Sequence, residues 1–421
     1  MTDTQKVITL LGSAGGAAKS VLAILNQSAV DTEDAIHHLI KDSTLHLIDI
    51  EQKEKAYYQH LFPHLQNQLI LHQFDLADTK HFSKHLTQSH TNIVIDVSWA
   101  DTIEMVRCCN QLGILYVNSA LENAYIDENE KLYAGFTLIE RIYAFEKQKD
   151  TFTNTTAIIG SGMNPGVVQW MALELLKESS TEKPIGMYIV EYDSSFFKDK
   201  NKAEKDVLYT TWSPVCFLDE AIDSYPMLMQ HATPLFLYEE VYSLRFKVQL
   251  GDKQFEGCLM PHEEVYTLCQ LYDVEGGFLY RVNDHTTTLI TTHLDEVDEL
   301  WNYDMKVLNP LEEEMIGEDL VGVLLVYPDK ECYMYNVMTN QSVFSQYKTN
   351  ATYFQVACGI YASLCVLLLD SIPNGAYYVD ELLLHTQNQY GQYLKHYMKD
   401  FVTGTNDHTD GLLLQRLIKK E

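Results

Sequence analysis

The first 150 residues alternate short apolar runs with amphipathic stretches, and this alternation constrains the fold more than any other feature. Residues 7–11, 46–49 and 93–96 have the length and composition of buried strands. Helical periodicity separates such runs, most clearly between residues 102 and 112. Strands that alternate with helices form right-handed βαβ crossovers. We therefore predict an α/β protein with a parallel sheet of Rossmann type.

A glycine-rich turn follows the first predicted strand. Gly12 comes directly after the strand, and Gly15 and Gly16 precede a helical pattern. A strand, a glycine turn and a helix bring the backbone close to the pyrophosphate of a dinucleotide. When the turn is spaced as GxGxxG, Ala14 and Ala17 stand where the second and third glycines belong. We predict that the three glycines bind a dinucleotide cofactor.

Polar residues end the strands of this first region. Asp49 ends the second strand, where a carboxylate bonds the ribose 2′-hydroxyl and favours NAD over NADP. The alternative for this residue is an ordinary solvated strand end. Asp96, Ser98 and Asn118 follow later strands. Because ligands bind beyond the carboxyl ends of parallel strands, we predict that all four line the cofactor site.

A second strand–turn–helix pattern lies near the middle of the chain. An apolar strand pattern that includes Ile158 and Ile159 leads through glycines to Asn164, Pro165 and Gly166, and an apolar helical pattern follows. Proline is favoured just inside a helix start, so we expect the helix to begin at Pro165. Its free N–H groups would then face a ligand above the strand. The alternative is an ordinary corner between a strand and a helix.

The pattern changes after residue 150, and 421 residues exceed one ordinary core. Several runs predict a second domain built on a largely antiparallel sheet. The predicted strands are residues 185–193, 237–250, 254–259, 278–282, 286–292, 322–326 and 332–335, with a turn at Gly251-Asp252. Helical patterns cover residues 353–369 and 379–399. We predict domains at residues 1–150, 151–345 and 346–421, the last a set of helices packing back on the first.

Composition narrows the classes of partner. A net charge of -29 opposes binding to nucleic acid or to an anionic membrane. The eight cysteines show no CxxC pair and no metal-ligand spacing, so we expect free thiols, no metal and a cytoplasmic location. The first residues lack the apolar core of a signal peptide. The apolar stretch 353–369 includes Gln355 and Ser363 and is short for a membrane span, which favours a buried helix.

Five segments, spread over most of the chain in the same order, resemble the bacterial homospermidine synthases within the wider group of saccharopine reductase-like enzymes. The segments are residues 115–122 (LYVNSALE), 162–170 (GMNPGVVQW), 209–213 (YTTWS), 319–325 (DLVGVLL) and 350–356 (NATYFQV). The resemblance implies a Rossmann domain, a mixed α/β substrate and dimerisation domain, a homodimer and tightly held NAD. It also implies a redox-neutral reaction that joins two putrescine molecules through an imine, with loss of ammonia.

The resemblance assigns roles to individual residues. Glu191 would bind a substrate ammonium group, for which a carboxylate suits because it accepts charge-assisted hydrogen bonds. Trp212 would stabilise cationic intermediates with its ring face, and Asp319 would hold a cation. Asn164 would orient substrate or nicotinamide. The alternatives are a surface carboxylate for Glu191 and a core side chain for Trp212.

A His-x-Glu motif resembles the part of the family site that receives the second amine. Its imidazole, His262, would shuttle a proton, and its carboxylate, Glu264, would hold a cation. A metal site is the rival interpretation of His-Glu-Glu, but no HExxH spacing supports it. Asn283, Asp284 and His285 resemble a family Asn-Asp pair only after a gap, and their role stays open.

Two other functions fit the same residues. A saccharopine- or carboxyspermidine-dehydrogenase type of reductive condensation would need an arginine for the substrate carboxylate, and only Arg281 falls near the predicted site. A non-catalytic NAD-binding sensor of redox state or polyamines is the third hypothesis. Cys216 and Ala221 stand where the homospermidine synthases tend to have glycine, which indicates a divergent substrate.

Overall fold

The computed structural model describes residues 5–178 and 182–418, and the chain divides into two compact units. Unit 1 contains the residues up to Asn129 together with Glu140–Val167 and Tyr353–Met398. Unit 2 contains Glu130–Ile139, Val168–Thr352 and the residues from Lys399 onward. The division differs from the expected limits at residues 150 and 345, because the chain passes between the units more than once.

Unit 1 is built on a seven-stranded sheet in the order β19-β6-β5-β4-β1-β2-β3. Every pair in it is parallel, which confirms the predicted Rossmann-type sheet. The strands are β1 (Val7–Leu11), β2 (Thr44–Asp49), β3 (Leu69–Gln73), β4 (Ile93–Asp96), β5 (Leu115–Asn118), β6 (Thr156–Ile159) and β19 (Gly375–Tyr378). Strand order reverses between β1 and β4. Open parallel sheets bind ligands at such a reversal, beyond the carboxyl ends of the strands, which here is the end of β1.

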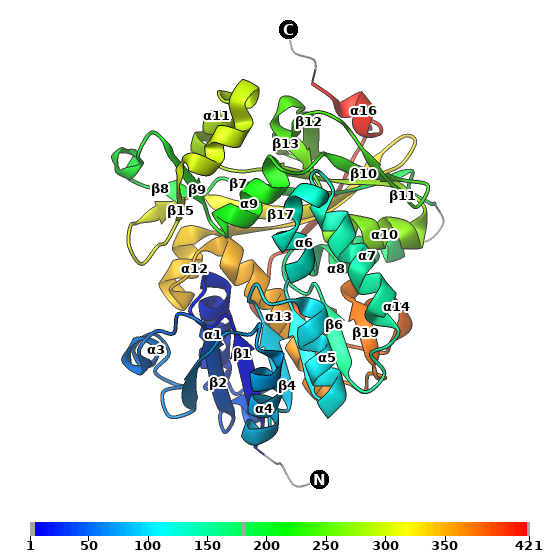
Figure 1. Cartoon of the computed structure of the whole chain (residues 1–421). Coiled ribbons are helices and arrows are strands. Elements are labelled where there is room, and N and C mark those ends of the chain that lie inside the picture. The colour runs from blue at the N-terminus through cyan, green and yellow to red at the C-terminus, as the bar shows by residue number, and fades with distance from the viewer. Residues whose placement is uncertain (1–4, 179–181, 419–421) are drawn as a thin grey trace. The chain divides into compact units, whose positions relative to one another are not determined.

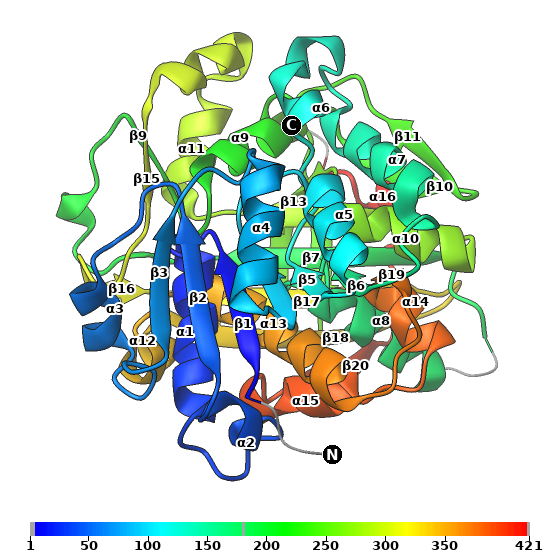
Figure 2. The ribbon, with the colours of Figure 1, turned by 60° about the horizontal axis from the view of Figure 1, so that its bottom comes forward.

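Helices cover both faces of this sheet. Figure 2 shows α4 and α5 in front of the sheet, with α1 behind β2. The helices are α1 (Gly16–Ser28), α2 (His37–Ile40), α3 (Lys55–Leu61), α4 (Thr79–Ser89), α5 (Thr102–Leu112), α6 (Ala124–Glu128), α7 (Thr137–Lys149), α13 (Ala351–Leu369), α14 (Val379–His385) and α15 (Tyr390–Tyr397). Helices α4 and α5 begin at Asp78 and Asp101, whose carboxylates accept from N–H groups of the first turn.

Helix α13 is long and apolar enough to cross a membrane, but 78% of its most apolar window is buried, as in the core helix of a soluble protein. The helical pattern at residues 379–399 is interrupted, contrary to the prediction of one helix. The Asn388 side chain explains the break. Its amide donates to the Leu382 carbonyl of α14, and its oxygen accepts from the Tyr390 N–H of α15. One asparagine therefore ends one helix and starts the next.

Unit 2 contains a nine-stranded mixed sheet in the order β11-β10-β14-β7-β17-β18-β20, with β13 paired to β14 and β12 paired to β13 (Figure 1). Its strands are β7 (Gly186–Asp193), β10 (Met227–Gln230), β11 (Thr233–Phe236), β12 (Phe246–Leu250), β13 (Lys253–Met260), β14 (Glu275–Arg281), β17 (Glu318–Val326), β18 (Glu331–Thr339) and β20 (Val402–Asn406). The pair β7–β14 is parallel and the other pairs are antiparallel, which confirms a second domain on a largely antiparallel sheet.

Smaller elements complete unit 2. Two short ladders pair β15 (Asp304–Val307) with β9 (Val207–Thr210) and β16 (Met315–Ile316) with β8 (Phe196–Phe197). The helices are α8 (Val167–Glu178), α9 (Pro214–Ala221), α10 (Glu263–Tyr272), α11 (Asp284–Thr291), α12 (Asn340–Tyr347) and α16 (Leu413–Arg416).

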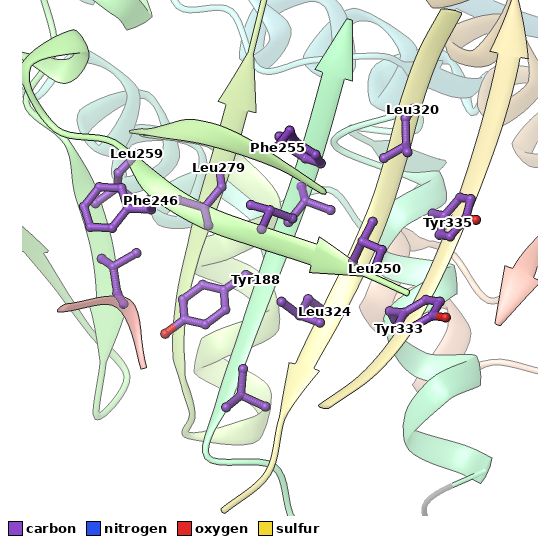
Figure 3. Close-up of a cluster of buried hydrophobic side chains, with 14 of the residues drawn as sticks. Tyr188, Phe246, Leu250, Phe255, Leu259, Leu279, Leu320, Leu324, Tyr333 and Tyr335 are labelled. Atoms are coloured by element: carbon purple, nitrogen blue, oxygen red, sulfur yellow. The ribbon is translucent and has the colours of Figure 1, made fainter. Parts of the chain in front are cut away.

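The two faces of the central strands in unit 2 differ in character. One face carries a hydrophobic core in which Tyr188 and Leu324 pack against Phe246, Leu250 and Phe255 of the β12–β13 hairpin (Figure 3). The predicted turn at Gly251 closes this hairpin, with a φ of +67° that favours glycine. Because alternate residues of a strand face opposite ways, the neighbouring positions on β7 and β17 present the other face. That face carries the acidic residues described below.

The threonine-rich run at residues 286–292 was predicted as a strand, and this prediction is wrong: the run forms α11. The Asn283 side chain caps the helix by accepting from the Thr286 N–H at 3.0 Å. The Thr288 and Thr291 hydroxyls donate to carbonyls four residues earlier, at 2.6 and 2.8 Å. Capping and these back-bonds outweigh the strand preference of β-branched residues.

The prediction of a strand from residue 237 is also wrong over its first part. Only Phe246–Leu250 is a strand, and a 3₁₀ turn occupies Val241–Ser243. The Ser243 hydroxyl donates to the Glu240 carbonyl at 2.7 Å and stabilises this turn.

Pro165 precedes helix α8, which begins at Val167, so the predicted helix start was two residues early. Gly166 has a φ of +127°, outside the helical region, and a Cβ there would lie 2.3 Å from the Gly162 carbonyl oxygen. The Val167 N–H donates to that same carbonyl at 3.2 Å. Residues 162–166 therefore fold back as a tight loop that needs glycine at its end.

Candidate functional site

The glycine turn at the carboxyl end of β1 has the backbone of a dinucleotide-binding loop. Gly12 has a φ of +70°, and a Cβ there would lie 2.7 Å from the Val97 carbonyl oxygen. Gly15 is the N-cap of α1. Within the described chain, no side chain caps the start of this helix, and the first turn contains no acidic residue. The first N–H groups of α1 therefore suit an anion such as a pyrophosphate.

Gly16 lies at a close contact between helices α1 and α13. A Cβ on Gly16 would lie 2.1 Å from the ring of Tyr353 on α13. Helix α1 therefore approaches α13 closely at Gly16, where a larger residue would clash. This contact is distinct from the helix–strand packing that the last glycine of the fingerprint serves.

Asp49, at the end of β2, lies beside the same turn. Its carboxylate accepts from the Ala14 N–H at 2.8 Å and from the Glu51 N–H at 2.9 Å, and the side chain is half-buried. The carboxylate is thus held at the strand end where a ribose hydroxyl would bind.

The change Asp49→Asn is expected to alter the choice of dinucleotide. Asparagine keeps an oxygen that accepts from the Ala14 N–H, so the turn is preserved while the negative charge is lost. We expect about 10-fold weaker NADH binding and a gain for NADPH, because a charge-assisted bond to the ribose is lost and the repulsion of a 2′-phosphate is removed. Fluorescence titrations with NADH and with NADPH measure the ratio of the two affinities. An unchanged ratio would contradict a ribose-binding role for Asp49.

Asp96, Ser98 and Asn118 lie at strand ends, but the structure shows internal bonds for them. Asp96 is buried and accepts from the Ser98 N–H, the Ser98 hydroxyl and the Tyr116 hydroxyl at 3.0, 2.6 and 2.9 Å. Burial raises its pKa. The Asn118 oxygen accepts from the Gly160 N–H at 2.9 Å. These side chains therefore shape the loops beyond β4, β5 and β6.

The predicted catalytic residues fall into two groups. Asn164 lies in the 162–166 loop of unit 1 and is half-buried. The other five, Glu191, Trp212, His262, Glu264 and Asp319, all belong to unit 2. Within unit 2 the structure brings them to one face of the central sheet.

Three buried carboxylates form the centre of the unit 2 site. Glu191 and Asp193 lie on the same face of β7, and Asp319 on β17 pairs in register with Asp193. Their exposed fractions are 4%, 0% and 0%. Burial raises the pKa of Asp319 well above its usual range, and the charges of Glu191 and Asp193 raise it further. Such a cluster favours a bound cation or a bound proton.

Two threonines connect the carboxylates. The Thr211 hydroxyl lies 2.5 Å from Asp193 and 2.9 Å from the Thr352 hydroxyl, which lies 2.6 Å from Asp319. Two hydroxyl protons cannot supply three hydrogen bonds. A proton on Asp319 completes the chain, because Asp319 then donates to Thr352, Thr352 to Thr211 and Thr211 to Asp193. The raised pKa of Asp319 agrees with this arrangement.

An aromatic row borders the carboxylates. Tyr280 on β14 pairs in register with Glu191, and its hydroxyl accepts from the Trp212 indole N–H at 3.3 Å. Phe278 stacks on Tyr280 with ring centroids 5.7 Å apart, and His262 lies 4.5 Å from Phe278. The row therefore runs from the carboxylates to the His262–Glu264 pair.

His262 and Glu264 form a buried hydrogen-bonded pair between β13 and α10. The His262 Nδ1 contacts Glu264 Oε2, and Glu264 Oε1 has no hydrogen-bond partner within the described chain. Burial by itself lowers the pKa of His262, but the charge and hydrogen bond of Glu264, with Glu220 and Glu263 nearby, raise it to about 9. His262 is therefore a protonated donor at neutral pH.

The stability of the protein is expected to fall between about pH 6.5 and pH 9. The native pKa of His262 lies above the value of 6.5 for a free imidazole, so its contribution is complete below pH 6.5 and is lost as pH rises through about 9. The rise in the pKa of His262 on folding corresponds to about 3 kcal/mol of unfolding free energy. Urea unfolding of the wild type and of Glu264→Gln at pH 6.5 and 9.5 measures this loss of unfolding free energy. An equal loss in both proteins would contradict this assignment.

Sequence reasoning missed Asp193, Thr211, Tyr280 and Thr352. Asp193 lies two residues after Glu191 on a predicted strand, so strand alternation alone could have placed both on one face. Thr352 carried no such signal, because it reaches Asp319 from the start of a different element.

Arg281 is directed away from the carboxylates. It pairs in register with Tyr192, whose ring it covers at 5.2 Å, and its guanidinium donates to Asp284 at 2.8 Å. It therefore lies on the opposite face of the sheet from Glu191.

The fold and the sites define a class: a two-unit α/β protein with a Rossmann-type parallel sheet and a second, mixed sheet. No protein-family model matches the chain, and no curated protein matches its sequence. Among solved structures, the chain is similar to apo saccharopine dehydrogenase (L-Glu forming) from Saccharomyces cerevisiae. The TM-score is 0.57 and the identity 11%, over 95% of this chain and 100% of that one. The chain therefore has the fold of saccharopine dehydrogenase along nearly its whole length.

Two weaker matches each cover less than half of the chain. UDP-glucose-4-epimerase from Stenotrophomonas maltophila, with bound NAD, has a TM-score of 0.25 and 10% identity over 44% of this chain and 65% of that one. WbmH from Bordetella bronchiseptica, in complex with NAD⁺, has a TM-score of 0.25 and 10% identity over 45% and 68%.

Proposed function

We propose that the protein is a nicotinamide-dependent enzyme of the homospermidine synthase type, which joins two putrescine molecules with loss of ammonia. The observation that carries the proposal is the cluster of Glu191, Asp193 and Asp319, three buried carboxylates beside an aromatic row. A buried cluster of this kind suits an aliphatic ammonium group, because the ammonium supplies both the missing charge and three N–H donors.

The glycine turn of unit 1 fits the cofactor. Gly12, Gly15 and Gly16 with the uncapped start of α1 would hold the pyrophosphate, and Asp49 would hold the adenosine ribose, which favours NAD. When bound there, NAD would supply reversible hydride transfer at the amine-bearing carbon of the substrate, with no net oxidation over the cycle.

The carboxylates would bind and orient the diamine. Glu191 would accept hydrogen bonds from one ammonium group, and Asp319 would lose its proton as the cation arrives. The Trp212 indole donates to Tyr280, the register neighbour of Glu191. Its ring face would stabilise a positively charged imine by about 2 kcal/mol. Binding of the diamine is therefore expected to release a proton.

The His262–Glu264 pair would handle the proton exchanged between the two amines. The incoming amine must lose a proton to attack the imine carbon, and the departing amine must gain one to leave as ammonia. A protonated His262, held by Glu264, can donate to the departing nitrogen and accept from the incoming one. The proton count then balances over the cycle.

Reductive condensation of an amino acid with an aldehyde is the competing activity, and the fold shared with saccharopine dehydrogenase is the observation that favours it. The orientation of Arg281 opposes it, because this arginine contacts Asp284 and Tyr192 on the other face of the sheet. A carboxylate-bearing substrate would need a cation at the site.

Product analysis distinguishes the two activities. Purified protein is incubated with NAD and putrescine, and products are identified by mass spectrometry while ammonium and NADH are followed. Homospermidine with equimolar ammonium and no lasting rise in NADH is the expected result. If no homospermidine forms, and NADH is instead consumed with an amino acid and an aldehyde, the competing activity replaces the proposal.

A further inference from the structure

Three histidines meet on one face of the parallel sheet in unit 1, away from the glycine turn. His46 lies on β2, His72 on the edge strand β3 and His85 on α4. Each can offer one ring nitrogen, and the three nitrogens lie within 4.8 Å of one another. The glycine turn leads to α1 on the opposite face of the sheet (Figure 2), so the two sites are separate.

Strand register and helix packing bring the three rings together. His46 pairs with Ile70 and His72 pairs with Ile48, so both histidines project from the same face, two residues apart. Their rings stack with centroids 5.0 Å apart, and His46 Nδ1 lies 2.8 Å from His72 Nε2. The His85 ring meets both edge-on, at 5.2 and 4.5 Å.

The polar atoms of this cluster are incompletely satisfied. His85 is 7% exposed, and its Nε2 has no hydrogen-bond partner within the described chain. A buried nitrogen without a partner costs free energy unless a ligand uses its lone pair. Burial and the neighbouring imidazoles lower the pKa values of His46 and His85 to about 4, and the pKa of His72 is also lowered. Neutral imidazoles are the form that binds metals.

We propose that His46, His72 and His85 form a binding site for a divalent transition-metal ion, for which Zn²⁺ fits best. Imidazole nitrogens suit zinc, and zinc–nitrogen bonds of about 2.0–2.1 Å place tetrahedral ligands about 3.3 Å apart. To meet this geometry, the His46 and His72 nitrogens, 2.8 Å apart, need to separate by about half an ångström, and nitrogens that lie up to 4.8 Å apart need to approach. His72 is half-buried on the edge strand, which leaves the fourth position to water.

The ion would join the edge strand of the sheet to its neighbour and to α4. A bound ion that is absent from the unfolded chain stabilises the folded state. In the proposal the ion stabilises the fold of unit 1, and its binding does not depend on the reaction catalysed by the protein.

Metal titration of the full-length protein tests the proposal. After treatment with a chelator and its removal, the protein is titrated with Co²⁺ and with Zn²⁺ in competition with a chromophoric chelator. One ion per chain is expected, with the strong visible absorption of tetrahedral Co²⁺ and a rise of Tm on zinc addition. If wild type shows no stoichiometric binding or only the weak absorption of octahedral Co²⁺, the proposal is overturned.

Variants locate the ion among the 16 histidines of the chain. His72→Gln and His85→Gln are expected to bind zinc at least about 100-fold more weakly, because each removes a direct ligand. His64→Gln is the matched control, since His64 is exposed in a loop of the same unit. Circular dichroism shows that each variant is folded. Affinity equal to wild type in both cluster variants would also overturn the proposal.

Discussion

Glu191→Gln is expected to lower kcat/KM for putrescine by about 10²–10³-fold while leaving dinucleotide binding unchanged. Glutamine keeps the shape of the side chain but removes the charge that would pair with the substrate ammonium inside a buried site. Loss of one partner from a buried charge pair costs about 2–5 kcal/mol, or about 30- to 5,000-fold, and the expected loss lies in the middle of this range. Steady-state kinetics and NADH titration measure the two quantities.

Glu299→Gln is the matched control, because Glu299 is exposed in the same unit. Its kinetics are expected to equal those of wild type. Equal activity of Glu191→Gln and wild type would remove Glu191 from the site. Loss of both turnover and dinucleotide binding would instead indicate a general folding defect.

A companion change separates binding from stability. Asp319→Asn is expected to abolish putrescine binding and yet to raise the free energy of unfolding at pH 8. A carboxyl buried beside Glu191 and Asp193 stays protonated at that pH only at a cost in free energy, and a neutral amide does not have this cost. Asparagine also donates to Thr352, as a protonated Asp319 would. Calorimetry in buffers of different ionisation enthalpy is expected to show proton release on binding in wild type only.

Arg416→Met is expected to destabilise unit 2 by about 3–5 kcal/mol, because it leaves the charge of Glu331 buried without its cation. Both residues are at most 1% exposed, and the guanidinium contacts the Glu331 carboxylate. The guanidinium also donates to the Gly411 carbonyl at 2.8 Å and lies over the Tyr188 ring at 5.4 Å. This pair attaches the last described helix, α16, to the sheet.

Urea unfolding followed by tryptophan fluorescence measures this loss. Arg245→Met is the matched control, because Arg245 pairs with Glu256 on the surface at 2.9 Å, with half of its side chain exposed. Its effect is expected to be below about 1 kcal/mol. Combining Arg416→Met with Glu331→Gln is expected to cost less than the sum of the single changes, since neither charge is then left alone. Equal losses for Arg416→Met and Arg245→Met would contradict the argument.

Local patterns were sufficient where the backbone itself determines the structure. The runs at residues 7–11 and 93–96 are β1 and β4, and the glycine turn lies between β1 and α1 as predicted. Short apolar runs separated by helical periodicity have few other ways to be buried. The threonine-rich run at residues 286–292 failed because strand preference is a weak tendency, which the Asn283 cap and hydroxyl back-bonds reversed.

The amino-acid sequence by itself therefore determined the parallel sheet, the glycine turn and the acidic and aromatic residue types of the candidate site. Only the tertiary structure decided which of them meet. Thr352 joins Asp319 and Thr211 through bonds that span 33 and 141 residues, and His46, His72 and His85 converge from two strands and a helix. Such contacts depend on strand register and helix packing, because side chains far apart in the chain meet only after the sheet has assembled.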